Sequence, residues 1–178
     1  MFKASNNYDI YNPKNQEIIM NCREEKLGFF TKLLRFTNFR RMAPFNVVIK
    51  THDGNKVLSV KRGLSFILST VDVFDENDKL VGRFKQKFFP IGGKFNVLDA
   101  NENILCKLKG RWTGWDFKFV KEGTEYGHVS QKSAGLGKEM FTSADNYMLE
   151  IKDKVPKGDN LRILILAAVV CIDMVLKE

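Results

Sequence analysis

The apolar segment near the C-terminus constrains the fold most, because it is hydrophobic on every side of a helix. Residues 161–176 carry only two charges, Arg162 and Asp173, which bracket ten uninterrupted apolar residues. A helix without a polar stripe must be buried in protein or in lipid. A bilayer span needs about 20 apolar residues, and charges inside a span are costly. The segment therefore predicts a core helix over about 160–176 that the rest of the chain encloses.

The chain from Tyr8 to about Val155 alternates short strand-like runs with turn residues. Period-two alternation of apolar residues, bounded by turn residues, is typical of β-hairpins. Asp53-Gly54 indicates a tight turn, and for such a turn we expect a positive φ at both central positions. The predicted hairpins pair 8–11 with 16–20, 45–51 with 56–61, 71–74 with 79–84, 94–98 with 104–108, and 116–120 with 125–130, with a further strand at 147–151.

Ten to twelve antiparallel strands with one buried face predict a closed barrel, which leaves no exposed edge. The interior of such a barrel is too wide for side chains alone to fill, so the C-terminal helix is its natural filling. We therefore predict a single, mainly β domain over 1–178: a closed antiparallel β-barrel of about twelve strands around a buried hydrophobic C-terminal α-helix.

The charge of the chain favours an anionic partner. The formal net charge is +8, and residues 1–50 contribute +5 of it, from nine Lys/Arg against four Asp/Glu. Such an excess suits either a membrane surface or nucleic acid and does not choose between them. The cysteines Cys22, Cys106 and Cys171 are widely spaced, odd in number and without a CxxC pair, which predicts a reducing compartment. The first residues lack the apolar core of a signal peptide.

Several segments together resemble the phospholipid scramblase family and the related LURP-one-related and tubby C-terminal-like domains. Residues 141–147, Phe-Thr-Ser-Ala-Asp-Asn-Tyr, precede an apolar helix that ends Cys-Ile-Asp-Met at 171–174. Residues 8–12, 45–62 and 127–130 fit the same family, so the resemblance covers nearly the whole chain. It implies a twelve-stranded barrel around a central helix and an association with phospholipid membranes. In eukaryotic members it also implies calcium-triggered movement of lipids between leaflets.

The chain resembles a minimal form of that family. We expect no Pro-rich amino-terminal region, and the place of the acylated cysteine run reads Leu-Ser-Phe-Ile-Leu at 64–68. We therefore expect a non-enzymatic scramblase-like protein, peripheral on the cytoplasmic, inner face of the plasma membrane. It would bind anionic phospholipids, and whether it moves them is left open. The alternative is a soluble tubby-like module that binds phosphoinositides or nucleic acid without scrambling.

The segment 26–41 is the first candidate site. It holds five basic residues, four Phe, three Leu and no acid. Cations that meet anionic headgroups while Phe and Leu enter the interface are typical of membrane-touching segments. The alternative is that these apolar residues pair as strands or cover a barrel end. The predicted membrane-binding residues are Lys26, Phe29, Phe30, Lys32, Arg35, Phe36, Phe39, Arg40 and Arg41.

A second candidate is a basic strip along two strand-like segments. Alternate residues of a strand share a face, so these cations should point outward together. They form either a phosphate-binding strip or the solvated side of a barrel wall. Nearby, Trp112 and Trp115 favour core or rim packing over a membrane interface. The strip comprises Lys85, Lys87, Lys107, Lys109 and Arg111.

Catalytic and metal sites find little support. His52 and His128 have no nearby nucleophile and acid, and HExxH, GxSxG and phosphate-loop motifs are absent from the sequence. In eukaryotic scramblases an acidic loop before the terminal helix is proposed to hold calcium. Its counterpart here, 143–154, has only Asp145 as an acidic residue at a matching position, with Lys154 at the closing one. Calcium prefers six to eight oxygens, several from carboxylates. We therefore expect no cofactor and at most weak calcium binding.

Overall fold

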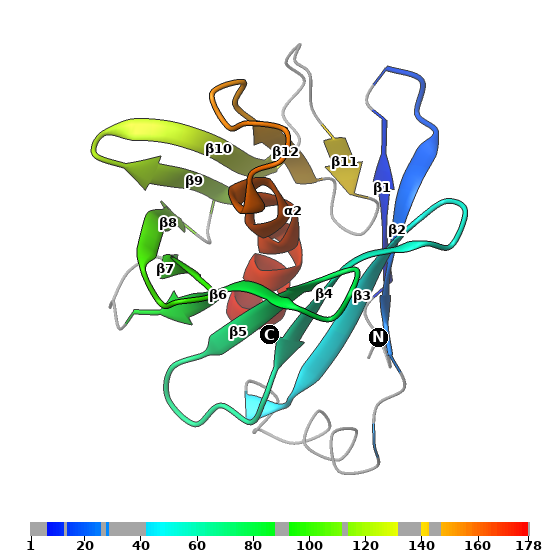
Figure 1. Cartoon of the computed structure of the whole chain (residues 1–178). Coiled ribbons are helices and arrows are strands. Elements are labelled where there is room, and N and C mark those ends of the chain that lie inside the picture. Colours follow the sequence, from blue (N-terminus) through cyan, green and yellow to red (C-terminus); the bar gives the residue numbers. More distant parts are fainter. Residues whose placement is uncertain are drawn as a thin grey trace.

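The computed structural model describes residues 7–12, 14–25, 28, 42–87, 93–111, 114–131, 140–142 and 147–177. Within these residues the chain is mainly β, and its strands surround one C-terminal helix (Figure 1). The strands are β1 (Asn7–Tyr11), β2 (Ile18–Glu24), β3 (Phe45–Thr51), β4 (Lys56–Arg62), β5 (Thr70–Asp75), β6 (Leu80–Gln86), β7 (Gly93–Asp99), β8 (Ile104–Arg111), β9 (Asp116–Lys121), β10 (Thr124–Gln131), β11 (Met140–Thr142) and β12 (Tyr147–Ile151).

The strands form one antiparallel sheet in the order β1-β11-β12-β10-β9-β8-β7-β6-β5-β4-β3-β2. Because β2 also pairs with β1, the order returns to its start as a closed barrel. Among the described residues, β1 pairs with β11 at two positions, Ile10 with Thr142 and Tyr11 with Phe141. The predicted mainly β fold with a C-terminal helix is confirmed. Strand β11 has no counterpart among the predicted strands.

Aspartate-led turns join β5 to β6 and β7 to β8. In the first, Asp75 Oδ1 accepts hydrogen bonds from the backbone N–H groups of Asn77 and Lys79, both at 2.9 Å. Asp99 accepts the equivalent pair in the second turn, at 2.8 Å each. Local side-chain acceptors of this kind favour a turn over continued strand. The Asp and Asn residues that predicted these hairpins therefore also build them.

The β3–β4 turn differs from its prediction. Among its residues only Gly54 has a positive φ, +87°, and Asp53 does not. The loop is longer than a two-residue turn, since the Thr51 N–H donates to the Asn55 carbonyl at 2.8 Å and the Gly54 N–H to the Thr51 carbonyl at 3.0 Å. Longer hairpin loops need the left-handed conformation at one position only, which glycine supplies. The hairpin was predicted correctly, but its turn geometry was wrong.

Helix α2 (Asn160–Ile172) fills the barrel and continues as one π-helical turn, η2 (Asp173–Lys177). It begins at Asp159, whose carboxylate accepts the Leu161 N–H at 2.8 Å as an N-cap. Buried residues lie on all its sides, as the absence of a polar stripe predicted: Leu161, Leu164, Ile165, Leu166, Ala167, Ala168, Val169, Val170, Cys171 and Ile172. Among the described residues, no helix has both the length and the apolar character that a bilayer crossing requires.

The two charges of this segment have separate hydrogen-bond partners. Arg162 lies near the helix start and donates to the Val155 carbonyl at 2.9 Å. Asp173 is buried at 6% exposure and accepts hydrogen bonds from the hydroxyls of Tyr8 and Tyr147. A carboxylate can stay buried when donors surround it. Polar contacts therefore tie the C-terminal end of the helix to strands β1 and β12, and its start to the loop after β12.

Candidate functional site: a cationic outer face

The predicted basic strip lies on the outer face of the sheet, and β7 separates its two strands. Its members are Lys85 in β6, Lys87 just after β6, and Lys107, Lys109 and Arg111 in β8. The three β8 members are exposed and alternate with residues that face inward. The alternation therefore places these cations together on the outer face, as predicted.

Strands β7 and β9 add two lysines that the sequence did not single out. Lys94 of β7 lies opposite Lys109 of β8, which in turn lies opposite Lys118 of β9. The Lys87 N–H donates to the Lys94 carbonyl at 2.8 Å and extends this series toward β6. We call Lys87, Lys94, Lys109 and Lys118 the lysine row. The alternation within each strand marked its members as outward, but only the order of the strands shows that they are neighbours.

The lysine row carries charge that nearby acids offset only in part. Directly opposite residues have Cβ atoms about 5 Å apart, and like charges at that separation are destabilising. Lys118 is paired with Glu125 at 3.3 Å between Nζ and Oε2. Lys109 lies between two lysines and has no ion pair with any described residue. An anion above this part of the row would relieve the repulsion, which is the property expected of an anion-binding face.

Part of the predicted strip is neutralised instead. Lys85 and Arg83 both contact the carboxylate of Glu102, and Lys85 Nζ lies 2.9 Å from Oε2. Hydrogen bonds from Lys85 and Arg83 lower the pKa of the Glu102 carboxyl, so the acid stays ionised. The Lys85 end is thus less available to an external anion than Lys107 and Lys109, which have no ion pair with described residues.

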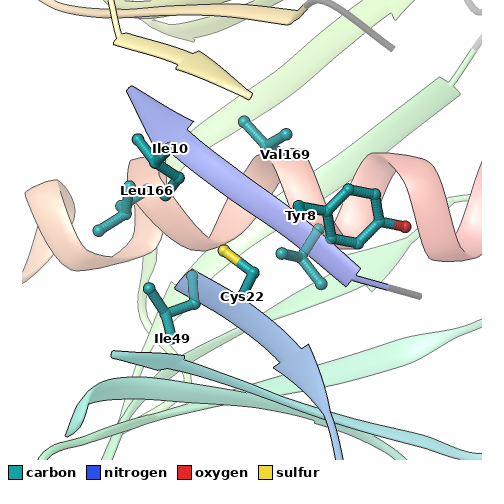
Figure 2. Close-up of a pocket in the computed structure, with 7 residues that line it drawn as sticks. Tyr8, Ile10, Cys22, Ile49, Leu166 and Val169 are labelled. Carbon is teal, nitrogen blue, oxygen red and sulfur yellow. The ribbon is translucent and has the colours of Figure 1, made fainter. Parts of the chain in front are cut away.

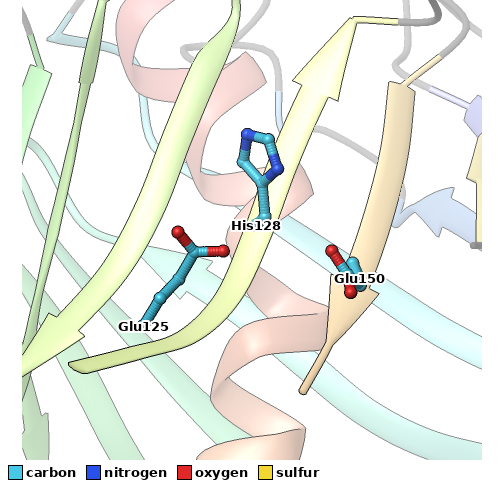
Figure 3. Close-up of side chains that lie close together, drawn as sticks. All are labelled: Glu125, His128 and Glu150. Atoms are coloured by element: carbon cyan, nitrogen blue, oxygen red, sulfur yellow. The ribbon is translucent and has the colours of Figure 1, made fainter. Parts of the chain in front are cut away.

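An acidic cluster on β10 and β12 borders the lysine row. Glu125, His128 and Glu150 bring potential ligand atoms within 4.8 Å of one another (Figure 3). The Lys152 ammonium lies 3.5 Å from Glu125 and 2.6 Å from Glu150, and His128 Nε2 lies 2.6 Å from Asp116.

Electrostatic contacts leave little unbalanced negative charge in this cluster. The hydrogen bond to Glu150 raises the pKa of Lys152. Although burial raises the pKa of Glu125, the contacts with Lys118 and Lys152 outweigh it and the net shift is downward. Since Lys152 already contacts both carboxylates, this cluster is an ion-pair network beside the lysine row.

A polar hollow of about 350 Å³ lies on the outer face of β3 and β4. Its wall includes Lys56 and Lys61, which lie 2.7 and 3.6 Å from the carboxylate of Asp78. The hydrogen bond from Lys56 is the main cause of a lowered pKa at Asp78. The Ser59 hydroxyl in the same wall is buried without a hydrogen-bond partner among the described residues. Because Asp78 forms ion pairs with both lysines, the charge in this hollow is less available to an external anion than that of Lys109.

One apolar cavity in the described interior is far smaller than this hollow. That cavity measures about 10 Å³ and lies between β1, β2, β3 and α2 (Figure 2). About 10–15 Å³ is needed for one water, and a water also needs polar partners. An acyl chain therefore does not fit there. The lining residues are Tyr8, Ile10, Cys22, Ile49, Leu166, Val169 and Val170.

Other predicted site residues lie outside the described residues. These are Lys26, Phe29, Phe30, Lys32, Arg35, Phe36, Phe39, Arg40 and Arg41, the calcium candidate Asp145, and Trp112. The flanks of the basic segment are described: the Glu25 N–H donates to Asn46 at 2.9 Å, and the Met42 carbonyl accepts from Ser65 at 3.3 Å. Trp115 is half-buried with its ring 4.8 Å from that of Tyr147, in agreement with rim packing.

Comparison with known proteins identifies the family. The family model described as Scramblase matches residues 1–178. The chain belongs to the Scramblase family. This scramblase-family chain is similar to human phospholipid scramblase family member 5, at 25% identity over 167 residues, 84% of this chain and 58% of that protein. It is also similar to a phospholipid scramblase family protein of Schizosaccharomyces pombe, at 25% identity over 156 residues, 78% of this chain and 41% of that protein.

The scramblase-family chain thus spans about half the length of these curated relatives. No solved structure matches it significantly. Both relatives are named as phospholipid scramblase family proteins, and the lysine row is a cationic surface in the described part of this chain.

Proposed function

We propose that this chain is a peripheral phospholipid-binding protein of the scramblase type, which holds anionic headgroups on the outer face of β7, β8 and β9. The observation that carries the proposal is Lys109, which lies between Lys94 and Lys118 and has no ion pair with a described residue. Family membership supports phospholipid as the source of the anion. The proposal includes no catalytic step and no cofactor.

The positive charge of this face would attract the protein to an anionic membrane surface. Each basic residue near an anionic membrane contributes about 1 kcal/mol, and this attraction falls off within about 10 Å at 0.1 M salt. Lys107 lies on the same exposed face of β8 as Lys109 and can add to the contact. We further propose that docking takes place on the inner face of the plasma membrane, where anionic lipid is concentrated.

Vesicle binding tests the proposal. Lys107→Gln combined with Lys109→Gln should weaken binding to phosphatidylserine vesicles about 30-fold at low salt, the equivalent of about 2 kcal/mol. Lys79→Gln combined with Lys157→Gln is the matched control, because it removes two exposed lysines from the β5–β6 turn and the loop before α2. The control should retain near wild-type binding. Equal losses in both pairs would show that net charge, and not this face, is responsible.

Two further measurements separate the proposal from its alternatives. Reconstitution in liposomes with a leaflet-specific fluorescent lipid should show protein-dependent loss of leaflet asymmetry if bound lipids are moved. Competition by short RNA or DNA tests the nucleic-acid alternative. Displacement of the protein from vesicles at equal phosphate concentration would favour a general phosphate-binding module over a lipid-specific one.

A further inference from the structure

The connection between β4 and β5 exposes an unusual amount of apolar surface. Single exposed hydrophobic residues are normal, whereas a contiguous exposed group marks a site of interaction. Most of the large hydrophobic side chains exposed in the described part of the chain gather in this short segment: Leu64 is 61% exposed, Phe66 77%, Ile67 84% and Leu68 43%. We call residues 64–68 the apolar tip.

The base of the apolar tip is fixed to the barrel. Arg62 is 4% exposed and donates to the Ala43 carbonyl at 2.5 Å and to the Ser69 hydroxyl at 3.3 Å. Ser69 and Gln86 join the tip to the end of β6, through an N–H to Oε1 bond of 3.0 Å and an N–H to carbonyl bond of 2.9 Å. The exposed side chains are therefore presented outward by a hydrogen-bonded base that includes a buried guanidinium.

Basic residues lie next to the apolar tip, in space or along the chain. Lys87 directly follows Gln86 and is exposed, and its N–H is bonded to Lys94 of the lysine row. Met42, which accepts the Ser65 N–H, directly follows the segment 26–41, whose sequence holds five basic residues and no acid. Residues 60–70 contain no acid either. Figure 1 shows the β4–β5 connection projecting at the lower edge of the barrel, beside the start of β3.

Apolar side chains at a projecting tip, with the exposed Lys87 beside its base, match an anionic bilayer better than a protein groove. The apolar side chains gain by leaving water for the acyl boundary, while the ammonium groups stay among the headgroups. We propose that the apolar tip inserts into an anionic lipid bilayer, with Phe66 and Ile67 deepest and Lys87 at headgroup level. This inference rests on the proposed function, since it specifies how the same protein holds the membrane.

Site-specific labelling tests insertion directly. The three native cysteines are buried, so Phe66→Cys introduces the one exposed thiol of the described residues. A polarity-sensitive dye on it should brighten with phosphatidylserine vesicles and be quenched by lipids that carry a nitroxide on the acyl chain. Ala100→Cys, exposed in the β7–β8 turn, is the matched control and should show neither change.

A binding measurement complements the label. Phe66→Ser combined with Ile67→Ser should weaken vesicle binding about a hundredfold, because each buried apolar side chain contributes about tenfold or more. Ile18→Ser, which alters a partly exposed residue of β2 away from the tip and from the lysine row, should bind as the wild type does. Phe66 and Ile67 are solvent-exposed, so the double variant should keep the melting temperature of the wild type.

The outcomes separate this inference from the function on which it rests. If the wild-type protein does not bind anionic vesicles at low salt, both the proposed function and the insertion of the tip are wrong. Vesicle binding with an unchanged signal at position 66 overturns insertion alone and leaves headgroup docking in place. A third outcome is a dimeric wild type, a monomeric double serine variant and unaltered vesicle binding. It would show that the tip mediates self-association and does not insert. Brightening, acyl-chain quenching and weakened serine-variant binding together support insertion.

Discussion

Removal of the Tyr147 hydroxyl is the sharpest test of how the helix is held in the barrel. Tyr147 is 1% exposed, and its hydroxyl lies 3.1 Å from Asp173 Oδ1. A hydrogen bond to a charged group contributes about 1.5–3 kcal/mol net. Tyr8 still donates to the other carboxylate oxygen, so the acid keeps one donor in the variant. We therefore expect Tyr147→Phe to lower the free energy of unfolding by about 2 kcal/mol.

The structure also supplies the assay and its control. Urea unfolding followed by circular dichroism gives the free energy, and a loss of about 2 kcal/mol corresponds to a melting temperature about 4–8 °C lower for a chain of this size. Tyr126→Phe removes a hydroxyl that has no hydrogen bond to a described residue, so it should cost little. In a double-mutant cycle with Asp173→Asn, Tyr147→Phe should cost less than it does alone.

Two results would refute this reasoning. If Tyr147→Phe and Tyr126→Phe destabilise the protein equally, the hydroxyl contributes nothing to holding the buried acid. If the cycle is additive to within about 0.5 kcal/mol, Tyr147 and Asp173 do not interact energetically, and this hydrogen bond does not help to hold the helix.

The remaining predictions concern the core and calcium. A thiol reagent should leave Cys171 unmodified in the native protein at pH 8 and label it after unfolding, because burial raises the pKa of its thiol and keeps it protonated. Gly82→Ala should destabilise by at least about 1–3 kcal/mol in urea unfolding, since a Cβ there would lie 2.2 Å from the Leu98 carbonyl oxygen; Gly158→Ala, with nothing within 4 Å, should not. Calorimetry should detect no micromolar calcium site, and such a site, lost in Asp145→Ala, would contradict the expectation drawn from the sequence.

The secondary structure was largely determined by local sequence. All five predicted hairpins are present, because period-two alternation specifies which face of each strand is buried. The Asp75 and Asp99 turns are local as well, since each acceptor lies within four residues of its donors. The helix was equally predictable, because a segment that is apolar on every side must be buried and this one is too short to span a bilayer. Strand β11 was not, since it has only three residues and forms by pairing with β1 and β12.

The candidate site depended on long-range register that no local pattern encodes. The sequence marked Lys85 and Lys109 as outward residues, yet Lys109 is flanked by Lys94 and Lys118 only because β7, β8 and β9 are neighbours in a particular register. The partners of Asp173 come from strands at opposite ends of the chain for the same reason.

The apolar tip shows most plainly which features the sequence alone does not predict. Residues 64–68 have the composition of a buried strand, and the sequence does not indicate that they face solvent. Their exposure follows from the positions of Arg62, Ser69 and Gln86, which hold the base of the connection against the barrel. Alternation along a strand determines which side chains face inward, but contacts between distant segments decide which surfaces are left for a partner.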